Sequence, residues 1–184
     1  MKTIKYVFTI AILLGLAAFV VSHVVPQTQH RARQDNVPGG TSVGDVVPPF
    51  TLESIDGKST SLYDLKDRLI LVNFWASWCG PCNEEAPSLE SAYKKLRQDG
   101  MVVVAISIDR HKKDVMSFVK KYSITFPVLM DTDEGVASEY GITGVPETFI
   151  VTQDHKLVKH IVGPLDWTSD TVIGYLQTLL GEGQ

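Results

Sequence analysis

The two cysteines of this chain lie at the point where one hydrophobic pattern changes into another. Residues 69–76, LILVNFWA, form a nearly continuous apolar run that is typical of a central buried strand. Residues 83–98 carry their apolar side chains at helical spacing, and Gly100 follows as a stop. Cys79 and Cys82 therefore lie at the junction between a buried strand and a helix, which points to an α/β fold.

The rest of the chain also alternates between strand and helix patterns. Asp56-Gly57 is typical of a hairpin turn, with a short strand on either side and a helical turn after the second strand. Residues 109–114, DRHKKD, are expected to form a solvated turn of mixed charge. Further strands are expected at 101–108, 126–130, 148–152 and 157–162, and further helices at 114–122, 134–140 and 167–180. This order predicts an α/β domain with a mixed central sheet flanked by helices.

The N-terminal part has a different composition. Two lysines precede an uncharged apolar run at 6–25, which at about 1.5 Å per residue is long enough to span a bilayer core of roughly 30 Å. The run is longer than the apolar region of a typical signal peptide and ends without a good small-x-small cleavage site. We expect a membrane anchor at 1–25, with a cleaved signal as the alternative, then a flexible linker at 26–44 and a folded domain at 45–184.

Charge and composition exclude several classes of protein. The 184 residues carry a net charge of −4, but residues 1–44 are basic and the folded domain at 45–184 is acidic. An acidic domain argues against a nucleic-acid binder with a basic face. A hydrophobic content of 44% argues against a disordered chain, and two cysteines are too few for a disulfide-rich scaffold.

The position of the cysteines favours redox chemistry. At a helix N-terminus, Cys79 would meet unpaired backbone N–H groups and the positive end of the helix dipole, which favour the thiolate and lower the pKa of the thiol. Pro81 suits the first helical turn, where its missing N–H has no partner to lose. With two residues between them, the sulfurs can close a small ring, so a disulfide can form and break without refolding the domain.

Four other roles for the pair are weaker. A purely structural disulfide across so short a loop contributes only about 2 kcal/mol on the chain-entropy model. Zinc needs four ligands, and His155 and His160 lie far along the chain with no second CxxC. Covalent haem attachment needs a histidine where the chain has Asn83, and a peroxidatic cysteine needs Thr or Ser where it has Ala76. We therefore expect redox exchange, with no metal and no cofactor beyond the redox-active Cys79–Cys82 disulfide.

The motif FWASWCGPC resembles the active site of the thioredoxin superfamily. With the apolar N-terminal run, the stretch SVGDVVPPFTLESIDGKSTSLYDLKDR and the later GVPETFIV, it is similar to the membrane-tethered TlpA/ResA/CcmG type of thiol–disulfide oxidoreductase in the redoxin (AhpC-TSA-like) superfamily. The likeness covers roughly residues 43–180. It implies a thioredoxin-like fold with an N-terminal hairpin extension and a central insertion around residues 112–130.

The resemblance also implies a substrate groove. Val145-Pro146 matches the loop that the superfamily holds in the cis form opposite the cysteine pair. This loop shapes the place where the backbone of a substrate docks and keeps metals off the thiols. On the other side of the groove, the resemblance places Trp78, Gly80 and Pro81 around the first cysteine.

The proton acceptor for the second cysteine is less obvious. Cytoplasmic thioredoxins carry a buried Asp where this chain has Asn73, and an amide cannot take a proton from Cys82. Glu85 matches an acid that ResA-like proteins keep beside the active site, and Glu147 resembles the PETF variant of the CcmG group. Desolvation would raise the pKa of a carboxyl group near a buried thiol pair, which suits proton transfer. We expect Glu85 and Glu147 to be catalytic; two solvated surface acids are the alternative.

These residues predict an extracytoplasmic thiol–disulfide oxidoreductase. Cys79 would attack a protein disulfide, and Cys82 would resolve the mixed disulfide. The resemblance implies apocytochrome c as a substrate, through its CxxCH cysteines, and a transmembrane thiol carrier as the electron donor. The Gly-Pro between the cysteines resembles reducing thioredoxins, so we expect a reductase. An oxidant or isomerase of disulfides, and a redox-silent peptide-binding module, are the alternatives.

The apolar N-terminal segment and the resemblance also predict a location. We expect a single-pass protein of the bacterial inner membrane, with its catalytic domain in the periplasm or on the outer face. If the N-terminal segment is cleaved, the domain would be soluble there. We expect a monomer that binds the membrane only through its anchor and binds no nucleic acid.

Overall fold

A computed structural model of the protein describes residues 41–182. The expected anchor at 1–25 and most of the expected linker lie outside these residues, so both stay predictions. Within the described part of the chain, no helix is long and apolar enough to cross a membrane.

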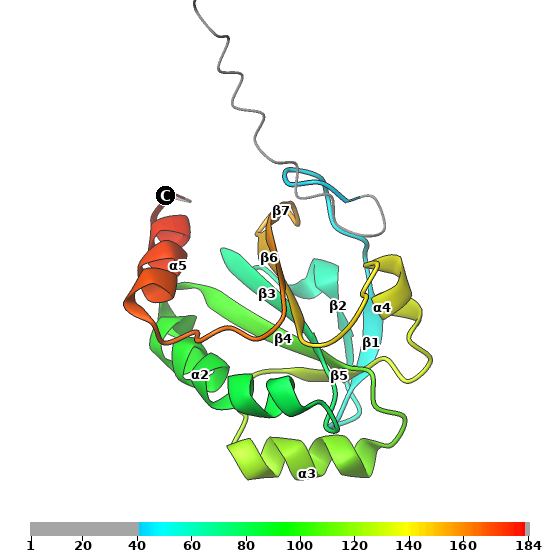
Figure 1. The fold of residues 1–184 in the computed structure, drawn as a ribbon. Coiled ribbons are helices and arrows are strands. Elements are labelled where there is room, and N and C mark those ends of the chain that lie inside the picture. Colours follow the sequence, from blue (N-terminus) through cyan, green and yellow to red (C-terminus); the bar gives the residue numbers. More distant parts are fainter. Residues whose placement is uncertain (1–40, 183–184) are drawn as a thin grey trace, which may run out of the picture. The chain divides into compact units, whose positions relative to one another are not determined.

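A mixed sheet forms the centre of the described domain (Figure 1). Its seven strands are β1 (Thr51–Ser54), β2 (Ser59–Ser61), β3 (Leu69–Trp75), β4 (Met101–Ser107), β5 (Val128–Met130), β6 (Glu147–Thr152) and β7 (Leu157–Val162). They lie in the order β2-β1-β5-β4-β3-β6-β7. The pairs β3–β4 and β4–β5 are parallel and the other pairs are antiparallel, which confirms the predicted mixed α/β fold.

Helices cover both faces of the sheet (Figure 1). They are α2 (Gly80–Leu96), α3 (Lys112–Tyr122), α4 (Gly135–Glu139) and α5 (Asp170–Glu182), with short 3₁₀ turns at η1 (Leu62–Asp64) and η2 (Arg97–Asp99). One core cluster joins one face of β3 and β4 to α2, α3 and α5, and the second joins the other face to α4 and to residues before β1. All seven positions of β3 and of β4 are buried, which explains why both strands are continuous apolar runs.

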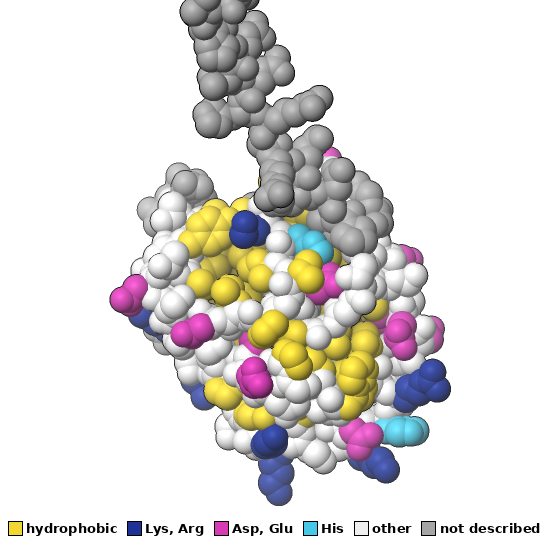
Figure 2. Space-filling model, viewed as in Figure 1, with side chains coloured by type: hydrophobic (Ala, Val, Ile, Leu, Met, Phe, Trp, Pro, Cys, Tyr) yellow, Lys and Arg dark blue, Asp and Glu magenta, His cyan; other side chains and the backbone are white. Residues whose placement is uncertain are grey.

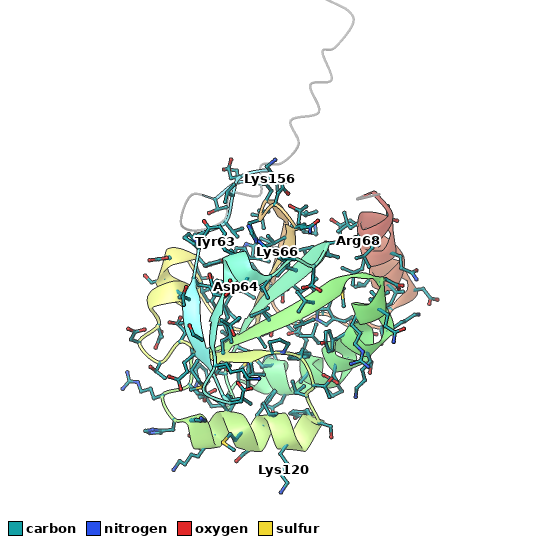
Figure 3. All side chains as sticks on the ribbon, turned by 180° about the vertical axis from the view of Figure 1, so that it is seen from behind. Tyr63, Asp64, Lys66, Arg68, Lys120 and Lys156 are labelled. Atoms are coloured by element: carbon teal, nitrogen blue, oxygen red, sulfur yellow. A yellow bond between two sulfur atoms is a disulfide. The ribbon has the colours of Figure 1, made fainter. Side chains whose placement is uncertain are left out.

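The N-terminal hairpin and the central insertion both extend this sheet. The hairpin β1–β2 turns at Asp56-Gly57, where Gly57 has a φ of 84° that favours glycine. The insertion contributes α3 and β5, and β5 pairs with both β1 and β4. At the other end of the domain, Arg68 donates a hydrogen bond of 3.2 Å to the carbonyl of Leu180 and ties the start of β3 to α5 (Figure 3).

All four helices begin at residues other than those predicted, and the differences are small for α3, at Lys112 instead of 114, and for α4, at Gly135 instead of 134. Helix α2 begins at Gly80 instead of residue 83, because the Cys79 side chain caps its first turn and Pro81 is accommodated in that turn. Helix α5 begins at Asp170 instead of residue 167. The delay has a structural cause, since the backbone and the indole of Trp167 both donate hydrogen bonds to side chains of α2.

Candidate active site

The two cysteines form a disulfide at the N-terminus of α2. Their Cα atoms lie 5.3 Å apart, and Cys79 is the N-cap residue of the helix. The backbone N–H of Cys82 donates to Cys79 Sγ over 3.1 Å. After reduction, this donor and the helix dipole would favour the thiolate of Cys79, as a nucleophile requires.

The two sulfurs face different spaces. Cys79 lines an open groove of about 840 Å³, together with Trp78, Gly80, Pro81 and Val145. The Trp78 side chain is 70% exposed beside it. Cys82 instead lines a small interior cavity of about 20 Å³. A substrate can therefore approach Cys79 from the groove, whereas Cys82 contacts only the interior.

The surface around the groove mixes apolar and acidic groups. Besides the residues already named, Ile108, Ala137 and Ile142 line the groove on its apolar side, and Asp133 and Glu134 line it at the start of α4. Figure 2 shows exposed hydrophobic patches with acidic side chains between them on one face of the domain. The groove therefore offers both apolar and acidic side chains to a molecule that approaches Cys79.

The proline loop (Thr143–Pro146) lies beside Cys79, and its first three residues line the groove. The Val145-Pro146 peptide bond is cis, as the resemblance implies. The carbonyl oxygen of Val145 lies 3.3 Å from Cys79 Sγ, so the loop touches the nucleophile. The Pro146 carbonyl in turn accepts a hydrogen bond of 2.9 Å from the N–H of Gly163, which follows β7.

A buried aspartate, absent from the predicted site, holds the loop before Cys79. The Asp109 side chain accepts from the backbone N–H of Ser77 at 2.8 Å and from its hydroxyl at 2.7 Å, and it also accepts from Ser107. The prediction of a solvated 109–114 turn is therefore wrong for Asp109, which is 3% exposed. A signal was present, because Ser77 and Asp109 each follow one of two adjacent parallel strands, whose carboxyl ends meet at one edge of the sheet.

Asn83 fastens the same loop from α2. Its side-chain N–H₂ donates to the carbonyls of Ser77 and Cys79, at 3.1 and 2.7 Å. Its amide oxygen accepts from Lys121 and from the hydroxyl of Tyr122, both in α3. The residue that excludes haem attachment in the sequence thus connects the inserted helix to the cysteine loop.

Glu85 is buried behind Cys82. Its side chain lines the same 20 Å³ cavity as Cys82, and the residue is 5% exposed. Glu85 Oε1 accepts from the indole N–H of Trp167 at 2.5 Å and from the backbone N–H of Leu165 at 3.3 Å. Burial raises the pKa of Glu85, and the hydrogen bonds from Trp167, Leu165 and Asn73 oppose this rise without reversing it.

Glu147 is buried at the start of β6, directly after the cis-proline. Its Oε1 accepts from the backbone N–H and hydroxyl of Thr143, both at 3.0 Å, and from the N–H of Gly144 at 3.1 Å. Its Oε2 lies 2.7 Å from Nε2 of His160. These contacts connect Glu147 to the proline loop and to β7, and none of them is with a cysteine.

Two side chains of β3, Asn73 and Trp75, also line the small cavity beside Cys82 and Glu85. Asn73 is buried in β3 and donates to the hydroxyl of Thr148 in β6 at 2.9 Å. Trp75 is buried against Phe118, with ring centroids 4.2 Å apart. Within the described residues, no group of three or more His, Cys, Asp or Glu side chains could hold a metal ion.

Comparison with known proteins agrees with this geometry. Residues 43–160 match the model of the AhpC/TSA family. The chain belongs to the AhpC/TSA family. Among AhpC/TSA relatives, it is 37% identical over 124 residues to the thiol-disulfide oxidoreductase ResA of Bacillus subtilis, covering 67% of this chain and 69% of that protein. It is 32% identical to ResA of Oceanobacillus iheyensis over 182 residues, 97% of this chain and 91% of that one.

Solved structures of other proteins show the same fold. A thiol:disulfide interchange protein DsbE from Chlorobium tepidum superposes with a TM-score of 0.71 at 28% identity, over 77% of this chain and 99% of that one. StoA from Bacillus subtilis gives a TM-score of 0.59 at 26% identity, over 73% and 97%. With the cysteine disulfide at a helix N-terminus, these likenesses identify this AhpC/TSA protein as a thiol–disulfide oxidoreductase.

Proposed function

We propose that this thiol–disulfide oxidoreductase reduces disulfides of extracytoplasmic polypeptides, such as the CxxCH cysteines of apocytochrome c. The observation that carries the proposal is the separation of the two cysteines, because Cys79 lines a groove of about 840 Å³ and Cys82 a small cavity of about 20 Å³. The groove has a volume of about 840 Å³ and apolar side chains in its lining, which suits a segment of unfolded chain. The cytochrome substrate itself rests on the resemblance to the ResA and CcmG types.

The reaction has two exchange steps. The Cys79 thiolate attacks one sulfur of the substrate disulfide, forming a mixed disulfide and releasing the other substrate sulfur as a thiolate. The Cys82 thiolate then attacks Cys79 Sγ, which releases the first substrate sulfur and closes the Cys79–Cys82 disulfide. Two electrons pass to the substrate, and a dithiol carrier must return two electrons to the protein.

Glu85 is the proposed acceptor for the proton of Cys82. The two side chains share a cavity of about 20 Å³, enough for one water, which needs roughly 10–15 Å³. Burial raises the pKa of Glu85 toward the pH at which it must exchange protons. Glu147 as the acceptor also stays a prediction, but its contacts with the proline loop favour Glu85 for this role.

The proposed location follows from the N-terminal sequence. The apolar run at 6–25 and the polar residues after it would tether the domain to the outer face of a bacterial inner membrane. A domain in that position draws electrons from the cytoplasm, so a transmembrane thiol carrier is the proposed donor. We propose that the protein acts as a monomer.

The reduction potential tests the proposed direction. The Cys79–Cys82 couple is equilibrated with glutathione buffers, and the reduced fraction is measured by thiol alkylation and mass. A reductase is expected to lie near the thioredoxin value of about −270 mV. A potential near the DsbA value of about −120 mV would contradict the proposal and favour an oxidant.

A substrate test complements the potential. The reduced protein is mixed with a synthetic peptide whose CxxCH motif carries an intramolecular disulfide, and peptide thiols are counted. Reduction of this peptide but not of a scrambled disulfide peptide would support the substrate class. A Cys79→Ser/Cys82→Ser chain that still restores function to cells lacking the protein would instead favour the redox-silent binding module.

A further inference from the structure

The buried histidine in β7 has no role in the exchange chemistry described above. His160 and Glu147 meet across the β6–β7 hairpin, and the side chains of the two residues are 6% and 1% exposed. In the antiparallel register His160 pairs with Phe149, so it lies diagonally opposite Glu147 on the same face of the sheet. The imidazole stacks on the Phe149 ring, with centroids 4.2 Å apart and planes 18° apart, which fixes its orientation.

The contacts of Glu147 run from this histidine toward the groove. His160 Nε2 lies 2.7 Å from Glu147 Oε2, within hydrogen-bond distance. The other oxygen, Oε1, accepts three hydrogen bonds from Thr143 and Gly144. Both oxygens are therefore occupied, one by β7 and the other by the loop.

The loop that Glu147 holds is the wall of the groove. Thr143, Gly144 and Val145 line it, and the Val145 carbonyl oxygen lies 3.3 Å from Cys79 Sγ. The backbone groups of this loop are the ones a docking polypeptide would meet beside the nucleophile. Without His160, the buried carboxylate would lose the partner that holds it from β7 and would be free to shift with the loop.

We infer that His160 is a positioning residue for substrate: through Glu147 it fixes the Thr143–Pro146 loop in the conformation that docks a polypeptide beside Cys79. The inference rests on the proposed function, because it assigns the loop to polypeptide docking. It also gives Glu147 a holding role in place of proton transfer. Substitution of the pair should therefore weaken substrate docking and leave the reactivity of the disulfide itself unchanged.

Amide hydrogen exchange tests the pair without any substrate. In a His160→Leu variant, the N–H groups of Thr143 and Gly144 should exchange about tenfold faster than in the wild type, whereas His160→Gln, which keeps a donor, should protect them. Glu90→Leu is the matched control, because Glu90 is a buried carboxylate that accepts from the N–H and hydroxyl of another loop residue, Thr125. Unchanged protection in His160→Leu would overturn the inference.

Single-turnover kinetics test the consequence. The reduced protein is mixed with the oxidised CxxCH peptide, the oxidised protein with the reduced peptide, and the oxidised protein with dithiothreitol. Whether the protein reduces or oxidises the peptide, His160→Leu should raise the half-saturating peptide concentration about tenfold. The limiting rate of exchange and the rate of reduction by dithiothreitol should both stay within about twofold of wild type. If the rate of reduction by dithiothreitol also fell about tenfold in His160→Leu, the site would be damaged in general, and the inference would be overturned.

The conservative variants separate the outcomes further. Glu147→Gln keeps an oxygen for the loop, so the half-saturating concentration should stay within about threefold, whereas Glu147→Leu should behave like His160→Leu. If the wild type fails to react with the peptide in either direction, the proposed substrate class is wrong. The amide exchange of Thr143 and Gly144 still decides the pairing in that case.

Discussion

Two buried glutamates flank the cysteine pair, and they differ in the groups that surround them. Glu85, in α2, accepts from an indole and a backbone N–H, and it shares a cavity with Cys82. Glu147, at the start of β6, meets a histidine and three donors of one loop. The roles we propose for these two similarly buried glutamates therefore differ, with proton exchange for Glu85 in α2 and loop holding for Glu147 in β6.

The difference follows from the elements that carry the two residues. Glu85 lies one helical turn after Cys82, so its carboxylate reaches the interior side of the disulfide. Glu147 directly follows the cis-proline, so its carboxylate reaches back to the loop that precedes it. Only the first arrangement brings a carboxylate to a cavity that a sulfur also lines.

Replacing Glu85 should have the largest effect. Glu85→Gln removes the proton acceptor of Cys82, so resolution of the mixed disulfide should slow about 100-fold, while the initial attack by Cys79 stays within about twofold. Stopped-flow mixing with quenched mass analysis measures both steps. Glu84→Gln is the matched control, because Glu84 is an exposed neighbour in the same helix. Equal resolution rates in the two variants would remove the distinction between the two buried glutamates.

A third buried acid extends the comparison to the loop before Cys79. Asp109→Ala leaves the Ser77 N–H without its acceptor and removes hydrogen bonds to a charged group, which should lower the free energy of unfolding by roughly 2–3 kcal/mol. Urea denaturation measures this change. The exposed Glu139→Ala variant should stay within about 0.5 kcal/mol of wild type. A loss in Asp109→Ala no larger than in this control would mean that the loop does not depend on Asp109.

The pH dependence of stability sharpens the contrast at Glu85. Because burial raises its pKa in the folded state above the ordinary 4.5, the folded protein binds a proton that the unfolded chain releases. This contribution is complete below about pH 4.5 and is lost as the pH rises through the folded-state pKa. As the pH rises through this pKa, the free energy of unfolding of the wild type should therefore fall by on the order of 1 kcal/mol relative to that of Glu85→Gln. Urea denaturation at several pH values measures this change. A difference that does not change with pH would contradict the raised pKa.

The hydrogen bond from Trp167 lowers the pKa of Glu85, but by less than burial raises it. Its indole N–H lowers the pKa of Glu85 against the effect of burial, so Trp167→Phe should raise that pKa further. The pH at which resolution of the mixed disulfide is half-maximal should move upward by less than about one pH unit. A downward move would mean that the indole does not stabilise the ionised carboxylate.

Lys120→Ala, on the outer side of α3, should change neither the rate of disulfide exchange nor the free energy of unfolding (Figure 3).

The sequence predicted those parts of the site that depend on local order. The apolar run of β3, the capping position of Cys79 and Pro81 in the first turn all lie within a few residues of one another, so pattern alone places the cysteines at a strand–helix junction. The cis form of Val145-Pro146 required the resemblance, because most X-Pro bonds are trans.

The parts that the sequence did not predict depend on strand pairing. Asp109 lies in a run of charges that looks solvated, and only the parallel register of β3 with β4 brings it to Ser77. His160 meets Glu147 through the register of β6 with β7, which is shifted between Ile150 and Val151. A shift of one residue would turn His160 to the opposite face, so no local pattern could have identified the pair.

The roles of the two sulfurs can be measured directly. Reduced Cys82→Ser and reduced Cys79→Ser chains are each mixed with the peptide whose CxxCH motif carries a disulfide, and covalent adducts are read by intact mass. Because Cys79 lines the groove and Cys82 the interior cavity, Cys82→Ser should accumulate a mixed disulfide with the peptide, and Cys79→Ser should form none. An adduct on Cys79→Ser, or none on Cys82→Ser, would contradict the account.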